Sequence, residues 1–195
     1  MKYLITGTPH SGTRYMALLF RAYGLDVNHE DMGEHGTSCW AWGAPDAHKV
    51  EAPWSPGLRP ILHPDEWTVV HIYRDPLVCI PALADDTKPE TLAFLSRFIP
   101  EADSLLHRAA MTYNVWNLLI RDIRPDHTIN VEDAEAWAAQ HLGRRWFPLP
   151  GTRTNTRARG KRQPLTWAQI EAEAPSELPL LRSMARERQY IVEAA

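Results

Sequence analysis

The stretch that most constrains the fold is the N-terminal segment KYLITGTPHSGTRY, residues 2–15. Residues 2–6 have the length and β-preferring content of a buried strand, and Gly7 ends that run. From Thr13 onward, apolar side chains recur at the spacing of one helix face; they are Tyr15, Met16, Leu18, Leu19, Ala22 and Tyr23. The segment therefore predicts a strand, a short glycine-bounded loop and a helix.

The loop from Gly7 to Gly12 has the GxxxxG spacing of a phosphate-binding loop. Small residues there let successive backbone N–H groups converge on an anion at the helix N-terminus. A loop for Mg²⁺-bound nucleotides continues with Lys and then Ser or Thr, whereas this chain continues with Thr13 and Arg14. The spacing thus predicts an anion site and weakens the Mg²⁺-nucleotide interpretation. A glycine turn without any ligand is the alternative.

Up to residue 142, predicted strands alternate with predicted helices. The further strands are residues 25–29, 68–73 and 127–131. The further helices are one that begins at Pro76 after an Asp75 cap, with Pro81 expected to kink or shorten it, and those over 91–98, 104–121 and 133–142, the last capped by Asp133. This alternation predicts a parallel sheet covered by helices on both faces.

Two segments depart from the alternation. Residues 33–66 hold many Gly and Pro and little periodicity, so we expect a loop with one helical turn around 38–42. A tryptophan- and proline-rich segment over the carboxyl ends of parallel strands is expected to shape the substrate site. Residues 153–162 carry five basic side chains and no acid, and residues 166–195 are expected to be helical with interruptions at Pro175 and Pro179.

Composition limits the classes of protein. A chain of 195 residues suits one α/β domain, with residues 1–150 as its core and 151–195 as a basic loop and helices. The net charge of −3 and the hydrophobic content of 44% give no bias towards nucleic acid or membrane partners. The first strand begins at residue 2, which leaves no room for a signal peptide, so we expect a cytoplasmic protein. Cys39 and Cys79 form no CxxC pair, so neither a disulfide framework nor a cysteine-rich zinc site is indicated.

The segment GTPHSGTRYM resembles the 5′-phosphosulfate loop of sulfotransferases that use PAPS (3′-phosphoadenosine 5′-phosphosulfate). The residues that match the family pattern are Pro9, Ser11, Gly12, Thr13 and Arg14. His10 stands where the family usually has Lys or Arg, so it would meet the leaving phosphate oxygen either protonated or as a neutral N–H donor. The resemblance implies a P-loop-like α/β three-layer sandwich with a central parallel sheet flanked by helices. It also implies PAPS as co-substrate and no metal ion.

The segment VVHIYRDP resembles the second signature of this family, in which an Arg at a strand end binds the 3′-phosphate of PAPS. The resemblance assigns that role to Arg74, whose planar guanidinium offers paired donors to phosphate oxygens. The family usually adds a Ser eight residues later, where this chain has Ala82. The alternative is a surface arginine that pairs with Asp75.

Two further matches are looser. GTRTNTRARGKR resembles, in composition and place only, the family's C-terminal loop that also meets the 3′-phosphate; Arg157, Arg159 and Lys161 would then bind the cofactor. A solvated basic loop is the alternative. INVEDAEAW resembles the family's strand-plus-helix segment and supports the topology alone.

The general base is expected in VNHEDMG, at the end of the strand that follows the loop and its helix. Neighbouring side chains on an extended strand point apart, so one of His29 and Glu30 would face the sulfuryl group. Glu30 is preferred because a strand-end Glu is the base in the heparan-type relatives, and His29 is its rival. His29 could instead be a buried histidine bonded to a carbonyl. A metal alternative would use His29, Glu30, Asp31, His35 and Cys39, although their spacing fits no closed zinc pattern.

Together these features predict transfer of a sulfuryl group from PAPS to a hydroxyl or amine of a small-molecule or glycan acceptor, without a nucleic-acid or membrane partner. A small P-loop kinase or other phosphoryl transferase is the first alternative. A relative that binds a nucleotide or a sulfated ligand without turnover is the second, because of His10 and Ala82.

Overall fold

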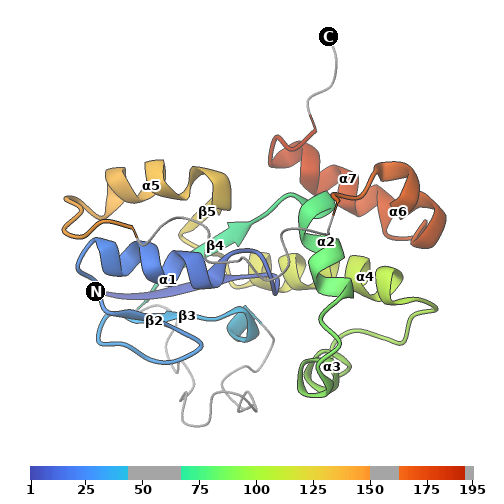
Figure 1. Ribbon diagram of the computed structural model, residues 1–195, viewed down its shortest axis with the longest axis horizontal. Coiled ribbons are helices and arrows are strands. Elements are labelled where there is room, and N and C mark those ends of the chain that lie inside the picture. The colour runs from blue at the N-terminus through green and yellow to red at the C-terminus, as the bar shows by residue number, and fades with distance from the viewer. Residues whose placement is uncertain (44–66, 150–162, 192–195) are drawn as a thin grey trace.

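The computed structural model describes residues 1–43, 67–149 and 163–191 (Figure 1). The strands are β1 Lys2–Gly7, β2 Val27–His29, β3 Gly36–Ser38, β4 Trp67–Tyr73 and β5 His127–Asn130. The α-helices are α1 Thr13–Ala22, α2 Pro76–Ala84, α3 Pro89–Leu95, α4 Leu105–Asp122, α5 Ala134–His141, α6 Trp167–Glu173 and α7 Leu178–Glu187. The described residues also form two short 3₁₀ helices, η1 Trp40–Gly43 and η4 Val131–Asp133.

The five strands form one parallel sheet in the order β2-β3-β1-β4-β5. β1 therefore lies in the middle, hydrogen-bonded to β3 on one side and to β4 on the other. This confirms the predicted parallel sheet. Because all strands run the same way, the segments that follow β1, β2 and β4 emerge at one edge, where ligands of open α/β sheets bind.

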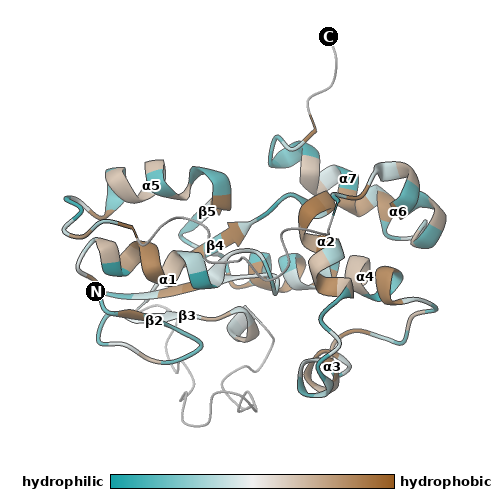
Figure 2. Cartoon of the chain, in the orientation of Figure 1, coloured by the Kyte–Doolittle hydropathy of each residue, from teal (hydrophilic) through white to brown (hydrophobic). Residues whose placement is uncertain are grey.

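Helices cover both faces of the sheet. Successive strand side chains point to opposite faces, so Leu4 and Val69 belong to one core and Ile5 and Val70 to the other. The first core is closed by η1, α3 and α4, and the second by α1 and α5. The arrangement is α/β and compatible with a three-layer sandwich. Figure 2 shows hydrophobic colour on β4, which contributes residues to both cores.

A third apolar cluster lies beside this sandwich. It joins α2 and α4 to the C-terminal helices α6 and α7, and its fully buried members include Ile80, Ile170 and Leu181. In Figure 1 these helices lie together on the right, away from α5. The C-terminal helices thus support α2 and α4, which in turn flank the carboxyl edge of the sheet.

Two sequence predictions need correction. The expected loop 33–66 contains the strand β3, whose Gly36 has φ 126° and approaches the Tyr3 backbone so closely that a Cβ would clash. Pro179 does not interrupt a helix, because it lies in the first turn of α7, where its missing N–H costs nothing.

The helices within the described ranges are also too short or too polar to cross a membrane: none of them meets the length and hydropathy that a span requires.

Candidate functional site

The loop over residues 8–12 leads from β1 into α1 and is closed by a backbone hydrogen bond in which Ser11 N donates to Thr8 O at 2.9 Å. His10 and Gly12 have positive φ angles of 67° and 114°. A Cβ at Gly12 would lie 2.6 Å from Val131 Cγ2, so this position requires glycine for space as well as for conformation. The predicted strand–loop–helix unit is confirmed.

The N-terminus of α1 has no side-chain cap and no acidic residue in its first turn. Its unpaired amides and the helix dipole together favour an anion. Thr8 and Ser11 are fully buried, and their hydroxyl oxygens have no hydrogen-bond partner within the described ranges. The Ser11 side chain packs against Gly7 beneath the loop, where a Cβ on Gly7 would clash with it. The Ser11 hydroxyl is thus buried against Gly7, and its backbone N–H is already bonded to Thr8 O, so Ser11 supports the shape of the loop.

Arg74 reaches this loop from the end of β4. Its Nη1 donates to His10 O at 2.9 Å. Asp75 accepts a hydrogen bond from Leu77 N at 2.9 Å and so caps α2, as its sequence position predicted. The Arg74 guanidinium is thus held against the predicted anion site, with the strand end and the loop fixed to each other.

A buried polar network holds the backbone of Arg74 from the other side. Tyr113 of α4 donates its hydroxyl to Arg74 O at 2.7 Å. Asn117 donates to Tyr113 O and lies 3.0 Å from His71 Nε2. Burial lowers the pKa of His71 to about 3, so His71 is neutral and bonds as a polar group. α4 therefore fixes the end of β4, which positions Arg74.

The ring of His10 makes a contact that the sequence did not indicate. Its Nε2 lies 3.1 Å from Asp86 Oδ2, in the connection between α2 and α3. The hydrogen bond from His10 lowers the pKa of Asp86, which keeps this carboxylate ionised at neutral pH. Asp86 lies 76 positions from His10 in sequence and belongs to no motif, so only the fold brings the two together.

His29, at the end of β2, contacts the first turn of α1. Its Nε2 lies 3.2 Å from Thr13 Oγ1, while Thr13 O accepts a hydrogen bond from Ser38 Oγ at 2.7 Å. Burial lowers the pKa of His29, opposed by the negative charge of Glu30 and reinforced by the positive charge of Arg14. His29 is consequently a neutral imidazole at pH 7, beside the predicted anion site.

Glu30 has left the extended conformation, with φ at 55°. Its Oε1 accepts a hydrogen bond from Trp40 Nε1 at 3.1 Å. His29 and Glu30 do not alternate along one strand as expected, because β2 ends at His29 and the chain turns at Glu30. The direction of the Glu30 side chain is thus set by this turn and by Trp40.

Of the other predicted residues, Pro9 and Arg14 lie in the described part of the chain. Pro9 is buried, and its carbonyl accepts a hydrogen bond from Cys79 Sγ at 3.5 Å, whereas Arg14 is exposed on the first turn of α1. Arg157, Arg159 and Lys161 lie outside the described residues, as does most of the predicted substrate-shaping segment. Trp40 and Trp42, at its beginning, are buried in the core between the sheet and α4.

The metal alternative receives no support from the geometry. In the described part of the chain, no three His, Cys, Asp or Glu side chains gather as they would around a metal ion. Burial raises the pKa of the Cys39 thiol to about 12, and His35 Nδ1 accepts a hydrogen bond from Asp26 N at 3.1 Å.

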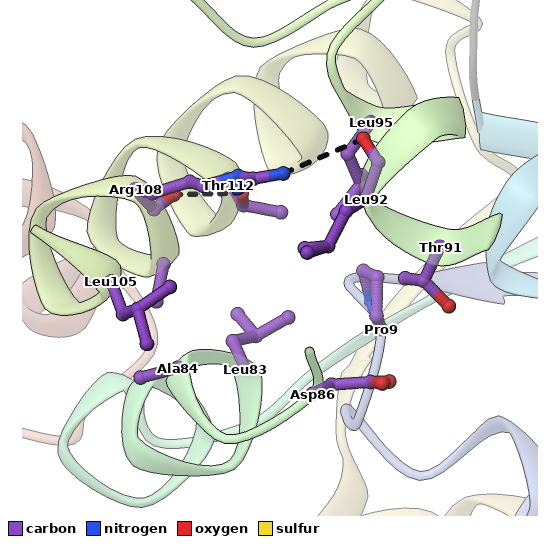
Figure 3. A pocket seen from close by; sticks show the side chains of 11 residues that line it. Pro9, Leu83, Ala84, Asp86, Thr91, Leu92, Leu95, Leu105, Arg108 and Thr112 are labelled. Atoms are coloured by element: carbon purple, nitrogen blue, oxygen red, sulfur yellow. Dashed lines mark hydrogen bonds between the residues drawn. The ribbon is translucent and has the colours of Figure 1, made fainter. Parts of the chain in front are cut away.

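A small hollow adjoins the loop. It lies between α2, α3 and α4, with Pro9 and Asp86 on one side and Leu83, Leu92 and Leu105 among its apolar walls (Figure 3). Its volume of about 10 Å³ holds one water molecule, which is too small for an acceptor.

Comparison of the chain with protein-family models, with curated proteins and with solved structures found no match.

Proposed function

We propose that the protein transfers a sulfuryl group from PAPS to a hydroxyl or amine acceptor. The observation that carries this proposal is the contact between Arg74 and the loop, 2.9 Å from Nη1 to His10 O. An anion at the uncapped N-terminus of α1 would lie beside a fixed guanidinium from the neighbouring strand. Two anionic groups on one ligand can use such a pair of sites, and PAPS carries a 5′-phosphosulfate and a 3′-phosphate.

In this proposal the loop binds the 5′-phosphosulfate and Arg74 binds the 3′-phosphate. The backbone of Pro9 to Gly12, together with Thr13 and Arg14, surrounds the transferring group and the departing phosphate. Arg157, Arg159 and Lys161, which lie outside the described residues, are proposed to add positive charge for the 3′-phosphate. Positioned donors of this kind stabilise charge that develops during transfer.

The acceptor oxygen or nitrogen attacks sulfur in line with the departing phosphate oxygen. A new bond to sulfur forms, the bond from sulfur to the phosphate oxygen breaks, and its electron pair stays on PAP, the desulfo product. The acceptor proton goes to a base on the protein. The scheme assigns no step to a metal ion.

We assign the base to His29, with Glu30 stabilising it. His29 is neutral because of burial, and its Nε2 lies 3.2 Å from a side chain of the first helical turn, so it can accept a proton near the sulfuryl group. The negative charge of Glu30 acts in the opposite direction to burial and so favours the imidazolium that forms. This assignment exchanges the order of the two candidates that sequence analysis preferred.

The proposal is tested by calorimetric titration with PAP, 5′-AMP, ADP and ATP with Mg²⁺. We expect PAP to bind with micromolar affinity or tighter in the absence of metal, and the other nucleotides to bind far more weakly. Preference for ATP with Mg²⁺ would favour a kinase. PAPS is also incubated with the protein and a panel of phenols, sugars and amines. Tight binding of PAP, with neither release of sulfate from PAPS nor transfer to any of these acceptors, would favour a binding protein.

A further inference from the structure

His10 is held at both ends. Its carbonyl accepts the hydrogen bond from Arg74, and its ring contacts Asp86 at 3.1 Å. Its backbone has the left-handed conformation, with φ at 67°, which is uncommon for a residue with a side chain. The position that usually carries Lys or Arg in the resembled family therefore carries, in this chain, an imidazole ring that is held in place.

Asp86 is itself fixed by the end of α2. Its amide donates to Leu83 O at 3.1 Å, and about four-fifths of its side chain is buried, with an exposed fraction of 16%. Lys88 is the nearest positive charge on the same connection and contributes to the low pKa of Asp86. Because its pKa is lowered, the Asp86 carboxylate is ionised throughout the neutral pH range and can accept a hydrogen bond from the His10 ring.

The chemistry of imidazole gives this contact a consequence. When Nε2–H donates to Asp86, a neutral ring keeps its lone pair on Nδ1, and a protonated ring presents Nδ1–H. Nδ1 of His10 has no hydrogen-bond partner among the residues that the structure describes. The carboxylate therefore selects which nitrogen of the ring is left for a ligand.

We infer that Asp86 is a positioning residue that holds His10 for binding of the 5′-phosphate oxygen from which the sulfuryl group departs. The inference rests on the proposed function, because it assigns the ligand of the loop. Binding then uses the Nδ1–H of a protonated ring, where a lysine would offer its ammonium. Charged groups near the loop include Arg74 from β4 and Arg14 from α1; His29 faces Thr13 as a neutral group.

The experiment compares the affinity for PAP at pH 6.0, 7.0 and 8.0 in four proteins: wild type, His10→Lys, Asp86→Asn and Glu90→Gln. Ratios between proteins at each pH cancel the titration of the ligand itself. We expect His10→Lys to bind PAP about fivefold or more tightly than wild type at pH 8.0, because a lysine ammonium stays charged at that pH. Glu90 is exposed in the first turn of α3, so Glu90→Gln controls for loss of a negative charge nearby.

Asp86→Asn keeps the size of the side chain and removes its charge. We expect it to bind PAP about fivefold more weakly than wild type at pH 7.0, because the ring loses the charged acceptor that fixes it. Asp86→Glu should recover part of the loss. Wild-type affinity at every pH in Asp86→Asn, or wild-type affinity at pH 8.0 in His10→Lys, would overturn the inference.

A second measurement needs no ligand. Nitrogen-15 NMR of the imidazoles at pH 8.5 should show His10 as the Nε2–H tautomer in wild type and as a mixture in Asp86→Ala, whose fold is checked by its thermal transition. An Nδ1–H tautomer in wild type would overturn the pairing. If the tautomers are as expected and PAP does not bind to any of the proteins, the proposed function fails while the pairing stands, and the inference about the ligand is withdrawn.

Discussion

The helices that follow the neighbouring strands β1 and β4 begin in opposite ways. α2 is capped by the Asp75 carboxylate, which accepts a hydrogen bond from Leu77 N. α1 begins after Gly12 with no side-chain cap. Both N-termini lie at the carboxyl edge of the sheet and both carry the same partial positive charge. The start of α2 is neutralised by its own chain, whereas the start of α1 is the place where we propose that an external anion binds.

The difference follows from one residue at the equivalent position. An aspartate supplies its own acceptor, whereas Gly12 has no side chain and is kept small by Val131. A helix N-terminus is therefore an anion site only where the chain leaves it uncapped. Substitutions at the two helix starts, and at the residues around them, measure how much this difference between α1 and α2 contributes to binding, transfer and stability.

The largest effect is expected on transfer at the uncapped end. His29→Ala should lower the transfer rate from PAPS by about 10³-fold, on the order of 4 kcal/mol in the barrier, because the general base is lost. Glu30→Gln should lower it by a smaller factor. Both variants should keep wild-type PAP affinity by calorimetry, and a fully active His29→Ala would place the base elsewhere.

Gly12→Ala tests the requirement for an unoccupied helix start. The added Cβ would meet Val131 at 2.6 Å and would have to adopt φ 114°, so we expect a loss of about 3 kcal/mol in the free energy of unfolding. Urea denaturation measures it. Gly143→Ala is the matched control, because its φ is also positive, at 82°, but nothing lies within 4 Å of the Cβ. Equal losses in the two variants would show that backbone conformation alone matters at Gly12.

Arg74→Ala separates the two phosphates of the proposed ligand. Loss of a charge-assisted contact should weaken PAP binding by about 2 kcal/mol and leave 5′-AMP binding nearly unchanged. Calorimetry with both nucleotides measures this difference. If both nucleotides lose affinity equally, Arg74 acts by holding the His10 carbonyl and not by binding a 3′-phosphate.

The smallest effect is expected at the capped end. Asp75→Ala should cost about 1 kcal/mol in the free energy of unfolding, and Asp75→Asn should recover most of it, because asparagine also caps helices. PAP affinity should stay within about twofold of wild type in both, since this helix start is not part of the proposed site. A larger change in affinity would mean that the two helix starts are not separate in function.

Local chemistry determined how much the sequence could predict. The unit from β1 to α1 was predictable because strand content, glycine spacing and helical periodicity agree within about twenty residues. The Asp75 cap was predictable because cap and helix are adjacent. β3 was missed because Gly36, Thr37 and Ser38 have no apolar alternation; they form a strand only because β1 and β2 offer hydrogen bonds on both sides.

The same limit applies to the site. Arg74 could be placed at the loop from its strand-end position and the family resemblance, but its bond to His10 O depends on the register of β1 with β4. Asp86 gave no signal, because an aspartate after a helix is common in exposed turns. The turn at Glu30, with φ at 55°, could not be predicted because the local sequence carries no turn signal at that position.

The central place of β1 also has a consequence for synthesis. Lys2 pairs with Trp67, so β1 is synthesised about 65 residues before its partner strand β4, a delay of several seconds at cellular rates of translation. The loop that β1 carries takes its shape from β4 and α2, so it is completed late in folding. A nascent chain can therefore bind an anion at this loop only after β4 has paired with β1, and β1 needs protection from aggregation until then.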